Sequence, residues 1–186
     1  MKKFATYLKV TLTKKPEWFD SFYERYSQPH EMHITLTQPR HIDETRVEDV
    51  KIEIDKVLKN NVFKDTDKHF IFDTFVYDKE PDGTYTVMLI TQGSSLLNNL
   101  QKDLRENLSQ FGNYVDAVME DYETKFRPHL TIGNNIGVQD IQEVENYLNK
   151  QNSFVEGVTG ELVLVAVENV NIAETKDSNN LTIFTI

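Results

Sequence analysis

The amino-acid sequence predicts a single α+β domain of 186 residues that is built from two related halves. This length is enough for one well-buried domain and too short for two large ones. Strand-like and helix-like apolar patterns alternate along the chain. A short motif, histidine, apolar residue, threonine, occurs once in each half, as HITL from His33 and as HLTI from His129. The halves are expected to be residues 1–92 and 93–186, divided near Gly93.

In the first half, strands are expected at residues 4–12, 32–37, 69–78 and 84–92, where β-branched and aromatic residues are frequent. Helices are expected at residues 16–27 and 43–60. Pro16 suits the first position of one helix, and apolar residues fall on one face of the other. Pro81, Asp82 and Gly83 are turn residues, so the last two strands are expected to form a hairpin.

The second half is expected to open with a helix at residues 94–112, between a serine cap and Gly112. A strand at 126–134 follows, entered through Pro128, and then a helix at 138–150 and strands at 160–170 and 181–186. Residues 113–125 show no clear pattern. The two halves share element order and the motif but no extended sequence identity, so the internal symmetry is a pseudo-twofold at most.

Composition excludes several classes of function. Thirty acidic against twenty basic residues leave a net charge of −10, which repels long polyanions, so any nucleic-acid ligand is expected to be small. Cysteine is absent, which removes thiol nucleophiles, disulfides and thiolate metal sites. No segment approaches the ~20 apolar residues of a membrane span. The first apolar stretch is broken by Thr6, Lys9 and Thr11, so it is interpreted as a strand of a cytoplasmic protein rather than as a signal peptide.

The two copies of the motif predict a site for a phosphodiester. Side chains alternate between the two faces of a strand, so His33 and Thr35 point one way, as do His129 and Thr131. If the two strands lie side by side, two imidazoles and two hydroxyls meet in one cleft. One neutral and one protonated histidine can divide proton transfer between them, and the hydroxyls can donate to non-bridging oxygens. Nothing in this scheme requires a metal or another cofactor.

A structural role for the histidines is the alternative. With five histidines and threonine at about one position in eleven, about half a copy of the motif is expected by chance, so one copy alone would mean nothing. Two copies, in apolar strands and in opposite halves, favour the functional interpretation.

Other residues are weaker candidates. Arg127 lies beside the second motif and could neutralise a phosphate, while Tyr7 and Tyr122 could stack on a base or be ordinary core or surface aromatics. His30 and His41 flank the first motif, but their spacing and the lack of a carboxylate pair argue against a metal site. His69 is interpreted as structural.

The paired motif, with Phe126 and Pro128 ahead of its second copy, resembles the 2H phosphoesterase superfamily, which includes bacterial 2'-5' RNA ligase-like proteins and cyclic nucleotide phosphodiesterases. The resemblance implies a bilobal α+β fold, with two mostly antiparallel sheets facing each other across a central cleft and helices outside. It agrees with catalytic roles for His33 and His129 and substrate-binding roles for Thr35 and Thr131. It further implies metal-independent cleavage of a 2',3'-cyclic phosphate, a 2'-5' linkage or a cyclic oligonucleotide signal.

Two hypotheses follow: a phosphodiesterase acting on a small nucleotide or short oligonucleotide, or a binding module of the same fold that does not turn its ligand over. The presence of both histidines and both threonines favours the enzyme. We expect no long nucleic acid and no membrane as partner, and favour a monomer. The Asn-, Asp-, Lys- and Ile-rich composition suits an AT-rich genome such as many bacteria and phages have, and a phage protein of this kind could destroy a nucleotide alarm signal in the host cytoplasm.

Overall fold

A computed structural model describes residues 1–27, 30–92 and 94–186. In this part of the chain seven strands form one sheet in the order β2-β1-β6-β3-β4-β5, with β7 paired to β6, and every pair is antiparallel. The strands are β1 (Lys2–Lys14), β2 (His33–Ile42), β3 (His69–Lys79), β4 (Tyr85–Thr91), β5 (His129–Ile136), β6 (Val155–Val167) and β7 (Leu181–Thr185). The antiparallel α+β class is therefore as predicted.

The expected two sheets are joined into one by the long strand β6. One edge of β6 pairs with β1 over almost its whole length, from Lys3↔Val167 to Lys14↔Glu156. Its other edge is divided, because residues 155–158 pair with β3 and residues 161–165 pair with β7. Hydrogen bonding thus continues from β1 to β3 through β6. The expected division between the halves falls at Gly93, which lies outside the described residues.

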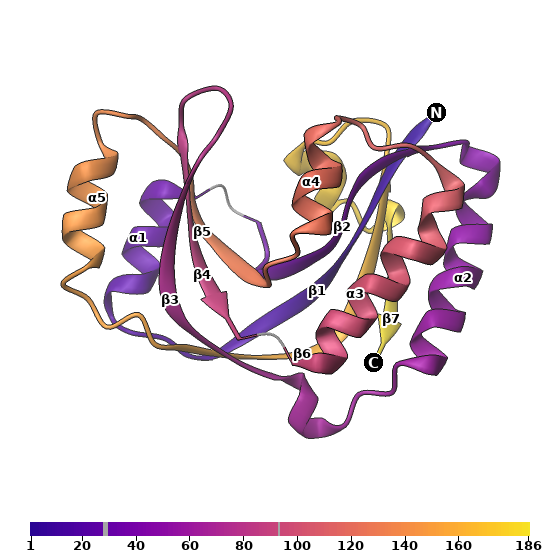
Figure 1. Ribbon diagram of the computed structural model, residues 1–186, viewed down its shortest axis with the longest axis horizontal. Coiled ribbons are helices and arrows are strands. Elements are labelled where there is room, and N and C mark those ends of the chain that lie inside the picture. Colours follow the sequence, from indigo (N-terminus) through magenta and orange to yellow (C-terminus); the bar gives the residue numbers. More distant parts are fainter. Residues whose placement is uncertain (28–29, 93) are drawn as a thin grey trace.

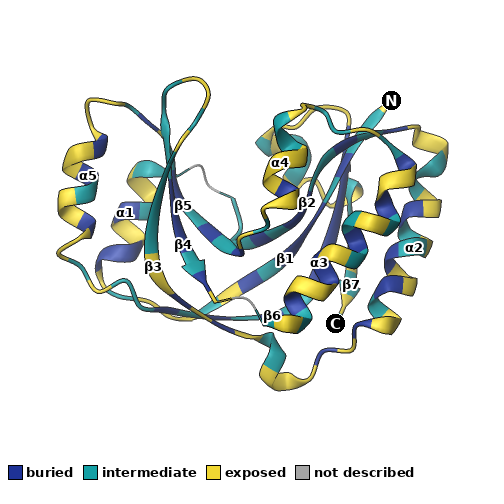
Figure 2. Ribbon diagram, viewed as in Figure 1, coloured by how far each residue is buried: buried dark blue, intermediate teal, exposed yellow. Residues whose placement is uncertain are grey.

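The helices cover the outer sides of the sheet (Figure 1). Helices α1 (Trp18–Tyr26) and α5 (Ile141–Leu148) lie outside strands β3, β4 and β5. Helices α2 (Val47–Asn60) and α3 (Ser95–Leu108) pack together, and α3 contacts β2. In these four helices the buried residues lie on the side turned towards the rest of the domain, as Figure 2 shows, so the amphipathic patterns of the sequence identify the packed faces correctly. Each fully buried apolar side chain contributes roughly 1.5–3 kcal/mol.

Local signals in the sequence account for the ends of several elements. The predicted serine cap is confirmed, since Ser94 Oγ accepts a hydrogen bond from the Leu97 amide at 3.1 Å and α3 begins at the next residue. The predicted hairpin of β3 and β4 is also confirmed. Its turn contains Gly83 at φ 89°, a conformation that glycine adopts readily and other residues rarely do.

Residues 113–125, which show no clear sequence pattern, cover part of the outer edge of β2. The His41 amide donates to the Asn113 carbonyl at 2.8 Å, and the Val115 amide donates to the Pro39 carbonyl at 2.9 Å. This close approach requires Gly112, because a Cβ there would lie 1.6 Å from the His41 carbonyl oxygen. The short helix α4 (Val118–Thr124) follows. Like α6 (Ile172–Lys176), it was not expected from the sequence.

Residues 113–115 bond to the last part of β2. The first part of β2, which carries the first motif, lies beside β5 instead. Strands β2 and β5 occupy the two ends of the strand order, yet they contact each other without forming a ladder. The sheet therefore curves until its two end strands meet (Figure 1). None of the described helices is long and apolar enough to cross a membrane.

Candidate active site

The two motifs begin the two strands that meet. His33 is the first residue of β2, and His129 is the first residue of β5. The apolar members of both motifs are packed in the core, where Ile34, Leu36, Leu130 and Ile132 are at most 1% exposed. The histidines and threonines lie on the other face and are partly exposed. The predicted alternation of side chains is thus confirmed in both copies.

All four polar side chains of the motifs line two cavities that share Thr131. A cavity of about 430 Å³ is lined by Thr35 of the first motif together with His129 and Thr131 of the second. An adjoining cavity of about 240 Å³ is lined by His33 and Thr131. Because Thr131 belongs to both cavities, one small ligand group between the strands can contact both motifs.

Each imidazole is held by the same local hydrogen bond. His33 Nδ1 lies 2.7 Å from the carbonyl oxygen of Glu31, and His129 Nδ1 lies 2.6 Å from the carbonyl oxygen of Arg127, in both cases two residues earlier in the chain. A carbonyl oxygen only accepts, so Nδ1 must carry the proton and donate it. Each ring is left with Nε2 as the nitrogen that can exchange a proton with a ligand.

The surroundings of both histidines favour the neutral imidazole. Burial lowers the pKa of His33 to about 4, and the nearby rings of His30 and His129 lower it further, while the bond to the Glu31 carbonyl opposes the shift. Burial also lowers the pKa of His129, the charge of Arg127 adds to this, and Asp78 opposes it. His129 and His33 border the two cavities that share Thr131.

The weaker candidates lie at different places around this space. Arg127 lines the 430 Å³ cavity and forms an ion pair with Asp78. Tyr122, on α4, lines the same cavity and is 42% exposed. Tyr7 lies beside His33, with ring centroids 5.0 Å apart, but it is only 6% exposed and its hydroxyl donates to Glu31 Oε1 at 2.6 Å. Burial and this bond raise the pKa of Tyr7.

The remaining histidines do not form a metal centre in the described part of the chain. The ring of His30 lies 5.0 Å from that of His33, centroid to centroid, whereas His41 lies near the other end of β2 and His69 is exposed at the start of β3. The described residues contain no group of three or more histidine, aspartate or glutamate side chains that could hold a metal ion.

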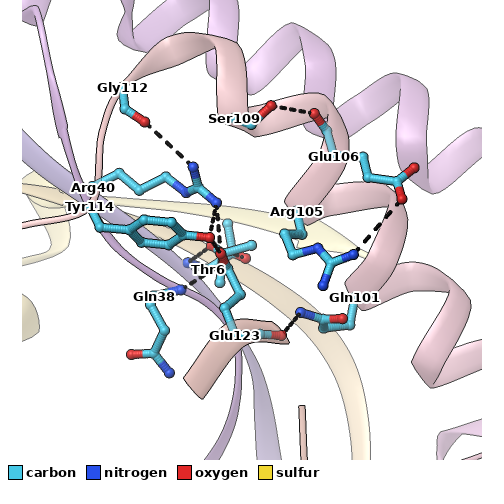
Figure 3. Close-up of polar contacts among 11 residues, drawn as sticks. Thr6, Gln38, Arg40, Gln101, Arg105, Glu106, Ser109, Gly112, Tyr114 and Glu123 are labelled. Carbon is cyan, nitrogen blue, oxygen red and sulfur yellow. Dashed lines mark hydrogen bonds and ion pairs between the residues drawn. The ribbon is translucent and has the colours of Figure 1, made fainter. Parts of the chain in front are cut away.

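A buried ion pair that the sequence analysis missed includes Glu123, which lines the 430 Å³ cavity (Figure 3). Arg40 of β2 and Glu123 of α4 are 3% and 2% exposed, and their Nη2 and Oε2 atoms are 2.6 Å apart. The Tyr114 hydroxyl also donates to Glu123, and the guanidinium of Arg40 lies 3.9 Å from the centre of the Tyr114 ring. No sequence signal marked this pair, because Glu123 falls in the segment without a clear pattern.

The ion pair connects the two motifs. Glu123 Oε1 accepts a hydrogen bond from the amide of Gln38 on β2 at 3.0 Å, and Gln101 of α3 donates to the Glu123 carbonyl at 3.0 Å. The chain runs only a few residues from Glu123 to His129. The carboxylate of Glu123 therefore anchors the segment before the second motif to β2, the strand that carries the first motif.

Comparison with known proteins identifies the family of this chain. The fold is that of the 2H phosphoesterase class. A family model described as the 2'-5' RNA ligase superfamily matches residues 10–171, and the chain belongs to this superfamily. No curated protein sequence matches it.

Solved structures share the fold at low sequence identity. The structure of Kluyveromyces marxianus Usb1 matches with a TM-score of 0.53 and 8% identity, covering 99% of this chain and 98% of that one. The structure of the same protein with uridine monophosphate matches with a TM-score of 0.54 and 9% identity, covering 100% and 98%. A crystal structure of a phosphoesterase matches with a TM-score of 0.50 and 10% identity, covering 100% and 96%.

The buried ion pair gives a prediction about stability. Arg40→Met leaves the Glu123 carboxylate buried without its cation, so we expect the free energy of unfolding to fall by roughly 3–5 kcal/mol. Arg105→Met is the matched control. The Arg105 side chain is 28% exposed and its ion pair with Glu106 is long, at 3.9 Å, so we expect this variant to lower the free energy of unfolding by less than about 1 kcal/mol. Urea denaturation of both variants measures the difference. Equal effects would show that the ion pair does not hold α4 on β2.

The shifted histidines give a prediction about pH. The pKa of His33 falls from 6.5 in the unfolded chain to about 4 in the folded protein, so the unfolded chain binds the extra proton between these values. Stability from the neutral ring is therefore complete above pH 6.5 and is lost as the pH falls towards 4. His129 acts in the same direction. Melting temperatures of wild type and His33→Asn across this range should show a shallower decrease in the variant, and equal slopes would contradict the assignment.

Proposed function

We propose that this protein is a metal-independent phosphodiesterase in which His33 and His129 act as a general acid and base pair on one phosphate. The observation that carries the proposal is that the two imidazoles have the same tautomer and the same local hydrogen bond. Both donate from Nδ1 to a carbonyl two residues earlier, so both have Nε2 available beside the space that the two motifs share. General acid and base groups must be within hydrogen-bond reach of the reacting oxygens, and the two available Nε2 atoms support both roles.

The reaction uses one proton on each side of the phosphorus. A neutral histidine accepts through Nε2 the proton of the attacking oxygen, from water or a ribose hydroxyl. The other histidine, protonated at Nε2, donates its proton to the leaving oxygen as the new P–O bond forms and the old one breaks. A bound phosphate favours protonation of one of the two rings, since a nearby negative charge raises the pKa of an imidazole.

The threonines and Arg127 act on the other oxygens of the phosphate. Thr35 and Thr131 line the same cavity as His129, and each hydroxyl can donate to a non-bridging oxygen, where negative charge increases in the transition state. Arg127 is available at the cavity wall, where it is held by Asp78. No step requires a metal ion.

The expected substrate is a small nucleotide or short oligonucleotide, cleaved at a 2',3'-cyclic phosphate, at a 2'-5' linkage or in a cyclic oligonucleotide signal. A nucleotide ligand is supported by the Usb1 structure with uridine monophosphate, which shares the fold. Small size is supported by the net charge of −10, which opposes the binding of long nucleic acids. We further propose that the protein acts as a monomer in the cytoplasm, or in the host cytoplasm if it is viral.

Turnover assays with histidine variants test the proposal. 2',3'-Cyclic mononucleotides, 2'-5' oligoadenylates and cyclic dinucleotides and trinucleotides are incubated with the protein in excess EDTA, and the products are identified. We expect activity to survive the chelator, and His33→Ala and His129→Ala each to lower turnover by about 10²-fold or more. His69→Ala, at an exposed position on β3, is the matched control and should retain activity.

Two results would contradict this mechanism. One is a rate close to wild type in either His33→Ala or His129→Ala, and the other is loss of activity in EDTA that one particular metal ion restores. Binding of a nucleotide without any turnover would instead support the alternative, a binding module of the same fold.

A further inference from the structure

The space beside the two histidines extends in two directions that differ in charge. We propose that the substrate is a phosphodiester joining two nucleosides, with an unphosphorylated nucleoside on the side of Glu80 and a further phosphate group on the side of Lys176. This inference rests on the proposed function and adds to it the class and the asymmetry of the substrate.

Three cavities, each sharing lining residues with the next, lie beside the motifs, and together they are called the trough. The α4 cavity, about 430 Å³, contains Thr35, His129 and Thr131. The central cavity, about 240 Å³, shares Thr131 with it and contains His33. The α6 cavity, about 520 Å³, contains Thr175 and Lys176 and shares Tyr23, His30 and Glu31 with the central one. A phosphate between the histidines therefore has room for a substituent on either side, and both outer cavities fall in the range of small-ligand sites.

The α4 cavity carries one carboxylate without a cation. Four acidic side chains line it, and three of them are neutralised by ion pairs. These pairs are Asp78 with Arg127, Asp121 with Lys125, and Glu123 with Arg40. Glu80 is the fourth, and it accepts hydrogen bonds from Thr86 Oγ1 at 2.7 Å and from the Tyr122 hydroxyl at 3.4 Å. A second phosphate in this cavity would lie near Glu80. Of the lining cations that the structure describes, Lys125 is paired with Asp121, and Arg127 is paired with Asp78 and already assigned to the scissile phosphate, so neither is left to offset it.

The rest of the α4 cavity suits an uncharged nucleoside. Tyr122, Phe126 and Met88 offer aromatic and apolar surface for a base, and Gln38 offers an amide that can both donate and accept. Glu80 can accept hydrogen bonds from ribose hydroxyls or exocyclic amines. The α4 cavity thus offers contacts for an uncharged nucleoside, and Glu80 repels a phosphate there.

The α6 cavity has a different charge balance, with one lining carboxylate and one lining lysine. Its one carboxylate, Glu31, accepts from the Tyr7 hydroxyl at 2.6 Å and forms an ion pair with Lys9 at 3.3 Å. Lys9 also pairs with Glu161, which lies outside the cavity lining. Lys176 has no carboxylate of the described chain within ion-pair distance. A phosphate in the α6 cavity can therefore interact with Lys176, whereas the described residues of the α4 cavity offer no such unpaired cation.

Dinucleotides that differ only in a terminal phosphate test the asymmetry. The substrates are a dinucleoside monophosphate, the same compound with a 5'-phosphate, and the same compound with a 3'-phosphate, all with the linkage identified in the turnover panel. We expect a phosphate at one end to raise kcat/KM by about three- to tenfold and a phosphate at the other end to lower it by a similar factor, the size of one exposed charge contact.

Two variants assign the ends to the cavities. Lys176→Ala should abolish the rise in kcat/KM that one terminal phosphate causes and leave unchanged the fall that the other causes. Glu80→Gln should reduce this fall and leave the rise unchanged. Lys51→Ala and Glu48→Gln, which break an exposed pair on α2, are the charge-matched controls and should alter neither.

The outcomes separate this inference from the proposed function. Equal kcat/KM for the three dinucleotides, or an effect of both variants at the same end, would overturn the asymmetry while cleavage itself stands. Cleavage of 2',3'-cyclic mononucleotides alone would also overturn it, since the second nucleoside would then have no role. Absence of any turnover that depends on both histidines would refute the proposed function and this inference with it.

Discussion

The ion pair between Arg40 and Glu123 holds together the two parts of the chain that carry the motifs. Strands β2 and β5 contact each other without a hydrogen-bonded ladder, so the sheet alone does not set their separation. Glu123 bonds both to the Arg40 side chain and to the Gln38 amide of β2. Since a buried carboxylate is tolerated only when it is paired and hydrogen-bonded, this contact has one well-defined geometry. Together with the pairing of His129 with Ile90 of β4, this contact supports the position of His129 relative to His33.

Strand alternation explains how much of the site could be predicted from the sequence. The period of two places histidine and threonine on one face of each strand and apolar residues in the core, and both copies follow it. Most helices and strands were predicted for a similar reason, because their periodicity is long and regular. Helices α4 and α6, with seven and five residues, are too short to show a period.

Contacts between distant segments could not be predicted in this way. The join of the two expected sheets depends on which residues of β6 pair with β3 and which with β7, and a strand pattern does not specify its partners. The charge of the trough depends on which carboxylates have a cation beside them. The total of −10 predicts a small ligand, but it does not show that Glu80 and Lys176 lie in different cavities.

The most direct test of the central claim is to observe both imidazoles as they bind one phosphate. NMR of the protein with ¹⁵N-labelled histidine reports the protonation of each ring nitrogen during titration with uridine monophosphate. We expect His33 and His129 to carry the proton on Nδ1 in the free protein, and both Nε2 signals to shift along one binding curve. A proton on Nε2 in either free ring, or a shift of one ring without the other, would contradict the claim that the two histidines act together on a single phosphate.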